Sequence, residues 1–226
     1  MKTVLVLFSI LVFANSYGQN DTVYYEDGSK YCGDFVGVSF DGIGTMIWAD
    51  GTMYSGEWKN HLQNGKGKLT WPNGDTYEGD WKNGMKSGKG IQTWITGERY
   101  EGDFLNDAFH GKGNMTWVGG SSDIGDWVYG QRSGTGTYTW STGEVYSGDW
   151  ENEVASGKGK MTWTTGDYYI GEWRNDVREG KGKMFWASGD KYSGEFMNNL
   201  IHGNGTMKYA NGTVNKGYWE EGVFIK

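Results

Sequence analysis

Apolar and polar residues alternate along most of the chain, and the alternation recurs in units of constant length. Counted from a recurrent Gly, such as Gly28, Gly51 or Gly74, each unit has 23 residues. Tyr, Gly and Trp or Phe fill positions four, six and eight, and polar residues stand between them. Gly, Gly, often Met, and Trp continue the alternation at positions fifteen, seventeen, nineteen and twenty-one. Because successive side chains of a strand point to opposite faces, each unit is predicted to form two β-strands.

Turn-forming residues separate the predicted strands. Asp50-Gly51 and Asn73-Gly74, which link consecutive units, are typical of short hairpin connections. A second turn inside each unit usually begins with Asn, as at Asn60, a residue that tolerates left-handed backbone, and we expect this turn to be the longer of the two. The units therefore predict an all-β fold, an elongated, twisted, single-layer antiparallel meander of hairpins with about 17 strands.

The composition fits a folded repeat protein and excludes several other classes. Aromatic residues make up 16% of the chain, too many for a disordered polypeptide. The 40 Gly come with a single Pro, which excludes a collagen triple helix. A net charge of −7 argues against nucleic acid as a partner, because that binding needs clustered Lys and Arg.

The first eighteen residues have the composition of a secretory signal peptide. A short basic start is followed by an apolar run, Val4 to Phe13, and then by small residues up to Gly18. The run is too short to span a bilayer, which takes about 20 residues. We expect cleavage after Gly18 and a location outside the cell, in the periplasm or at the cell surface. Beyond residues 1–18 we assign an N-terminal half repeat or cap to 19–27, eight units to 28–211, and a truncated ninth unit or C-terminal cap to 212–226.

The unit resembles a known repeat. The segment YSGEWKNHLQNGKGKLTWPNGD, from Tyr54 to Asp75, carries Tyr-x-Gly-[Asp/Glu]-[Trp/Phe]-x-Asn and then Gly-x-Gly. This pattern is similar to the MORN (membrane occupation and recognition nexus) repeat, and the resemblance covers nearly the whole chain after residue 18. It implies a scaffold, commonly a dimer, that grips partner segments along its aromatic surface. The family's name implies association with phospholipid.

The two faces of the predicted sheet differ in chemistry. One carries Asp, Glu, Lys and Thr, and the other carries Tyr, Trp and Met among Gly. A strand Gly leaves a depression in which a neighbouring ring can lie. We expect the rings to be only partly covered by one another, which leaves an aromatic trough as the candidate binding surface. Its residues are Tyr54, Trp58, Trp71, Tyr77, Trp81, Trp94, Tyr100, Phe104, Trp117, Trp127, Trp140, Tyr146, Trp150, Trp163, Tyr169, Trp173, Trp186, Tyr192 and Phe196.

Position seven is a column of carboxylates, from Asp34 to Glu195, on the polar face. Lys66, Lys89 and other Lys at positions sixteen and eighteen share that face, so cross-strand charge pairing explains the column. An enzyme needs one exceptional site, whereas the repeats offer eight equal ones. We therefore predict no catalytic residues and no cofactor.

The remaining candidate chemistry is sparse. His61, His110 and His202 are too far apart to share a zinc ion, so no metal site is predicted. Cys32, the single Cys, takes a place that other units give to Ser or Glu, either by drift or as a thiol able to link two chains. Asn-x-Thr at Asn20, Asn114, Asn204 and Asn211 matters only in a eukaryotic secretory pathway.

Unit five departs from the pattern, because Asp123 replaces the Tyr of position four. One interpretation is a worn repeat that adds a bend. The other is that Asp123 divides the aromatic trough in two and contacts a basic group of a ligand.

Three functions remain open. The first is a non-enzymatic interaction scaffold whose aromatic trough takes a peptide, a helix or a second copy of the chain, since Tyr and Trp are favoured interface anchors. The second is association with phospholipid, which the net charge disfavours because acidic headgroups attract basic patches. The third is carbohydrate binding by stacking of sugar rings on Trp.

Overall fold

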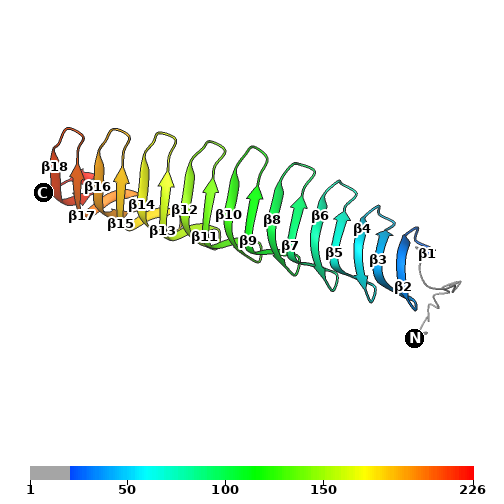
Figure 1. The fold of residues 1–226 in the computed structure, drawn as a ribbon. Helices are drawn as coiled ribbons and strands as arrows, with labels where there is room; N and C mark the ends of the chain where they lie inside the picture. Colours follow the sequence, from blue (N-terminus) through cyan, green and yellow to red (C-terminus); the bar gives the residue numbers. More distant parts are fainter. Residues whose placement is uncertain (1–20) are drawn as a thin grey trace, which may run out of the picture.

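The computed structural model describes residues 21–226, and the predicted signal peptide, residues 1–18, lies outside them. The described residues form one open antiparallel sheet of 19 strands without a helix, which confirms the predicted all-β meander. Each strand pairs with the strands before and after it in sequence, so the sheet is an elongated ribbon (Figure 1). The strands are β1 (Asp21–Tyr24), β2 (Lys30–Val36), β3 (Ser39–Ile47), β4 (Met53–Lys59), β5 (Leu62–Thr70), β6 (Thr76–Lys82), β7 (Met85–Thr93), β8 (Arg99–Leu105), β9 (Ala108–Thr116), β10 (Ser122–Val128), β11 (Gln131–Thr139), β12 (Val145–Glu151), β13 (Val154–Thr162), β14 (Tyr168–Arg174), β15 (Val177–Phe185), β16 (Lys191–Met197), β17 (Leu200–Lys208), β18 (Val214–Glu220) and β19 (Val223–Phe224). The expected count of about 17 omitted short strands at the ends of the chain.

The lengths of the two turns are the reverse of our expectation. Inside unit two, Asn60 and His61 alone join β4 to β5, with φ of 49° and 65°. Two consecutive left-handed residues make a type I′ turn, which needs no further residue. The connection between units is the longer one, because five residues, such as 71–75, separate the strands. These longer loops form the upper edge of the sheet in Figure 1.

Each unit also contains a bulge between its two strands. In unit one Gly33 pairs with Gly44 and Phe35 with Phe40, so one residue of β2 faces three residues of β3. The Gly at position fifteen lies in this bulge with left-handed φ, 114° at Gly42 and 64° at Gly65. The Asp34 carboxylate closes the bulge by accepting the backbone N–H of Ile43 at 2.8 Å. The bulge therefore needs a Gly and an acidic residue at fixed positions in every unit.

The core of the sheet is a ladder of rings laid over glycines. The Tyr54 hydroxyl donates to the backbone carbonyl of Glu57 at 2.9 Å, which holds the ring flat across Gly56 and Gly67. A Cβ added to Gly67 lies only 2.2 Å from the Tyr54 hydroxyl oxygen. The predicted depressions are therefore filled by Tyr rings, and seven of the eight units repeat this contact.

The ladder continues from unit to unit through edge-to-face contacts. The Tyr54 ring lies 4.9 Å from the Trp58 ring of its own unit and 5.2 Å from the Trp81 ring of the next. The Trp81 indole N–H donates to the Gly67 carbonyl at 3.1 Å. Edge-to-face ring pairs add stabilisation beyond their buried area, so each unit stabilises its neighbour.

We expect Gly67→Ala to destabilise the sheet by about 1–3 kcal/mol, because the new methyl group clashes with the Tyr54 hydroxyl. The measurement is the free energy of unfolding in urea. Gly136→Ala is the matched control, since Gly136 holds the same place in unit five, where the Tyr is missing and a Cβ meets Trp150 at 3.3 Å. An equal loss in both variants contradicts the role given to the Tyr ring.

Candidate functional site

Most of the predicted aromatic trough is buried. Tyr54, Tyr77 and Tyr100 are 0% exposed, and most rings at position eight are nearly as well covered. Twelve of the nineteen predicted side chains are closed off from solvent in this way: Tyr54, Trp58, Tyr77, Trp81, Tyr100, Phe104, Trp127, Tyr146, Trp150, Tyr169, Tyr192 and Phe196. The expectation that these rings line an open trough is wrong, because they form the core of the sheet.

In units one, three, four and seven the residue at position thirteen covers the ladder Tyr. Phe40 stacks on Tyr31 with 3.9 Å between ring centroids, and Phe109 stacks on Tyr100 at 3.8 Å. In unit three the Lys86 ammonium lies 5.0 Å from the centre of the Tyr77 ring. Sequence reasoning missed this position because its residues share no chemistry; they are Phe40, Gln63, Lys86, Phe109, Arg132, Ala155, Arg178 and Ile201.

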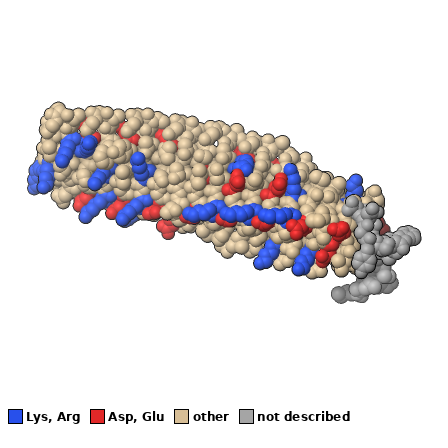
Figure 2. All heavy atoms as spheres, in the orientation of Figure 1, with Lys and Arg blue, Asp and Glu red and all other residues tan. Residues whose placement is uncertain are grey.

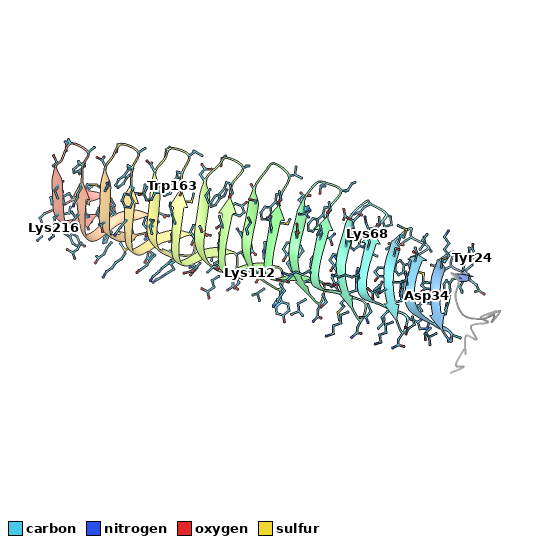
Figure 3. The ribbon with its side chains drawn as sticks, viewed as in Figure 1. Tyr24, Asp34, Lys68, Lys112, Trp163 and Lys216 are labelled. Atoms are coloured by element: carbon cyan, nitrogen blue, oxygen red, sulfur yellow. The ribbon has the colours of Figure 1, made fainter. Side chains whose placement is uncertain are left out.

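The accessible part of the predicted trough is a row of indoles at position twenty-one. Trp140 is 36% exposed, and the others are half-buried. Trp163 lies beside the upper loops in Figure 3, as its position directly after β13 requires. We define the Trp row as Trp48, Trp71, Trp94, Trp117, Trp140, Trp163 and Trp186. Trp173 of the predicted trough is also half-buried, at position eight.

The opposite, polar face carries a long groove of about 1580 Å³ that spans β4 to β12. Paired glycines form its floor, and Lys66, Lys89 and Lys112 lie along it. Figure 2 shows a band of basic side chains with acidic side chains on both sides. We call this surface the charged groove. Sequence reasoning assigned its residues to the polar face but did not foresee that the face is hollowed.

The lysines of the charged groove are paired with carboxylates across the strands, as predicted. The ammonium of Lys66 lies 2.5 Å from Asp80, that of Lys89 2.7 Å from Asp103, and that of Lys112 2.6 Å from Asp126.

These carboxylates have a second role, because each also accepts a backbone N–H across its bulge, at 2.9 Å for Asp80. Burial raises the pKa of Asp80, but the hydrogen bonds from Lys66 and from the Lys89 backbone outweigh it and hold the pKa below its ordinary value. The carboxylate column is therefore part of the framework as well as of the surface.

Unit five replaces the Tyr of the ladder with a buried carboxylate. Asp123 is 1% exposed, and one of its oxygens lies 3.5 Å from Nε of Arg132, the residue at position thirteen. Arg132 also pairs with Glu153 at 2.8 Å. The hypothesis that Asp123 contacts a basic group of a ligand therefore needs correction, because the chain supplies that group itself.

Unit five lacks the Tyr ring on β10 but has a Tyr on the neighbouring strand β11. Asp123 pairs across the strands with Tyr138, which occupies the place that most units give to Met. Tyr138 contacts Trp117 and Trp140 of the Trp row. Among the described residues Trp150 contacts the Tyr146 ring of its own unit but no ring of unit five, whereas Trp81 contacts Tyr54 of the unit before it, so the ladder is interrupted here.

Burial raises the pKa of Asp123 to about 6, although Arg132 opposes the shift. Between about pH 4 and pH 6 the folded chain therefore holds a proton that the unfolded chain releases, and stability falls as the pH rises. We expect Asp123→Asn to remove this loss, so its free energy of unfolding relative to wild type increases by about 3 kcal/mol from pH 4 to pH 7. Urea unfolding at several pH values measures it.

The control for this prediction is Asp126→Asn, for which the change in relative stability with pH is expected to have the opposite sign. Hydrogen bonds from Lys112 and Thr135 outweigh burial and lower the pKa of Asp126, so this variant loses stability relative to wild type as the pH rises through the acid range. If the difference in unfolding free energy between Asp123→Asn and wild type does not change with pH, the raised pKa of Asp123 is contradicted.

The other candidate groups lie apart from one another. His61 is in a turn, while His110 and His202 are on β9 and β17. Within residues 21–226 no three His, Cys, Asp or Glu side chains are grouped as metal ligands. Cys32 is half-buried on β2, and its predicted role in linking two chains stays a prediction. In the same part of the chain no helix has the length and apolarity to cross a membrane.

Comparison with protein families matches the MORN repeat to eight consecutive segments, residues 31–53, 54–76, 77–99, 100–122, 124–145, 146–168, 169–191 and 192–214. No curated protein matches the sequence.

Three solved structures are similar to this chain over most of their own length. The TCP domain of Drosophila melanogaster SAS-4 in complex with a proline-rich motif of Ana2 has 11% identity and a TM-score of 0.39, covering 91% of this chain and 96% of that one. The CPAP G-box domain has 12% identity and a TM-score of 0.36, covering 89% and 100%. The TCP10 domain of Danio rerio CPAP with a peptide of Danio rerio STIL has 10% identity and a TM-score of 0.32, covering 87% and 92%. Similarity at these TM-scores does not indicate a shared function.

Proposed function

Because this chain belongs to the MORN repeat family, we propose that it is a non-enzymatic scaffold that holds a segment of a partner protein. The observation that carries the proposal is the charged groove, a hollow of about 1580 Å³ that continues over several units of a regular sheet. A groove of this length fits a polypeptide better than a small molecule, whose pockets hold about 300–1,000 Å³.

The spacing of charges in the groove favours an extended segment. Equivalent lysines recur every two strands, or about 9.6 Å, and one three-residue turn of a polyproline II segment spans about 9.3 Å. Such a segment with acidic side chains at every third position presents them on one face, so it meets one lysine after another. The Lys66 side chain is 71% exposed despite its pairing with Asp80, so it is open to a second carboxylate.

The alternating charges argue against phospholipid as the main ligand. Acidic headgroups bind clusters of unpaired Lys and Arg, whereas the groove lysines face carboxylates of their own chain. The Trp row offers a second anchoring surface, and a second copy of the chain is the alternative partner there.

Chemical crosslinking in the native compartment tests the scaffold. We expect the triple variant Lys66→Glu/Lys89→Glu/Lys112→Glu to lose the crosslinked partner, because the groove then repels an acidic segment. Lys158→Glu/Lys181→Glu is the matched control, since both lysines hold the same position in units six and seven, outside the groove. Loss of the partner in the control, or its retention in the triple variant, rejects the groove as the binding surface.

We also infer that the protein is exported, from the composition of residues 1–18. In a secreting host, the exported protein is expected to begin at Gln19, and N-terminal sequencing measures this. Deletion of residues 2–18 is expected to keep the protein inside the cell. An exported protein that still begins at Met1 contradicts the inference.

A further inference from the structure

A second pocket, of about 530 Å³, lies on the aromatic face between the loops that follow units two and three. Trp71 and Trp94 of the Trp row and Phe109 give it apolar walls. Lys86 and Gln92 lie at its floor, and the carboxylates of Asp75 and Asp107 also line it. We call it the unit-three pocket.

Its floor differs from those of the other units. Gln92 is 4% exposed at position nineteen, where all other units have Met, Leu or Tyr. The Lys86 ammonium donates to the Gln92 amide oxygen at 2.6 Å and lies 4.8 Å from the centre of the Trp71 ring. Burial lowers the pKa of Lys86, with Asp107 and Asp75 opposing, so the ammonium is poorly solvated.

Lys86 covers the Tyr77 ring, but that cover does not require a polar pair. Units one and four place Phe and Met at the same two positions, where the Phe ring stacks on the Tyr of the ladder. Burying an amide and an ammonium costs free energy that an apolar pair avoids. A polar floor beneath apolar walls is the arrangement of a small-molecule site.

The polar groups retain capacity for a ligand. The Lys86 ammonium has three donors, of which Gln92 takes one. Asp107 accepts the Lys86 backbone N–H at 2.8 Å through Oδ1. Asp75 accepts the Ile95 N–H at 2.8 Å through Oδ1 and the Asn73 side-chain amide at 2.9 Å through Oδ2. An ionised carboxylate has about four acceptor positions, so both residues can accept further hydrogen bonds.

The mixture of charges selects the class of ligand. Lys86 repels a cation, and the two carboxylates repel an anion. A hydroxyl group donates to Asp and accepts from Lys, so a neutral polyhydroxylated molecule satisfies both. We propose that the unit-three pocket binds the neutral pyranose ring of a saccharide, with its apolar C–H face against an indole and its hydroxyls on Lys86, Asp75 and Asp107. This site does not depend on the proposed protein partner, because it lies on the other face of the sheet.

Titration calorimetry on the chain from Gln19 to Lys226 tests the proposal. The probes are methyl β-glucoside, methyl β-galactoside and methyl α-mannoside, with tetramethylammonium chloride and sodium acetate as charged comparisons. At least one glycoside is expected to bind, and more tightly than either salt. Binding of none of the three glycosides, or tighter binding of a salt, overturns the proposal.

Variants then locate the site. Lys86→Phe/Gln92→Met recreates the floor of unit four, so it is expected to keep or increase the melting temperature while losing the titration heat. Trp94→Ala is expected to weaken binding roughly tenfold or more, as for loss of an aromatic anchor. Trp186→Ala, the same position in unit seven, is expected to bind as wild type. Undiminished binding in the folded double variant overturns the proposal.

Discussion

The structure depends on one contact, a Tyr ring lying flat over a pair of glycines on neighbouring strands. The ring covers backbone that a single-layer sheet otherwise exposes, and its hydroxyl donates to a carbonyl three residues further on. A side chain at either glycine fills the space that the Tyr ring occupies. A residue smaller than Tyr leaves the backbone of the two glycines exposed to solvent. Repetition of this contact gives the sheet a core although no second layer packs against it.

The same constraint separates the two faces by role. With its rings used for packing, the aromatic face offers a partner only the Trp row and the unit-three pocket. The side chains of the polar face do not pack in the core, but its carboxylates accept backbone hydrogen bonds across the bulges. Its lysines are therefore the groups that a partner can engage without disturbing the fold.

The sequence was sufficient to predict the repeat length, the two strands of each unit, the charge pairs and the rings in the glycine depressions, since each rests on residues that recur. The cover provided by position thirteen could not be predicted, because Phe40, Lys86 and Ala155 share no property that marks them as equivalent. The groove was missed as well, since the alternation of side chains assigns residues to a face but does not give the shape of that face. The partner of Asp123 was missed because the bulge brings Arg132 to it.

The interruption of the ring ladder at Asp123 has a mechanical consequence. Rings in continuous contact transmit a local opening to their neighbours, so an unbroken array behaves as one cooperative block. Here the Tyr–Trp contacts of the ladder stop between Trp127 and Trp150, while the backbone pairing continues and Tyr138 keeps a contact with Trp117. Fraying that starts at one end of the ribbon can therefore be arrested at the middle, and the remaining half stays folded with its own surface intact.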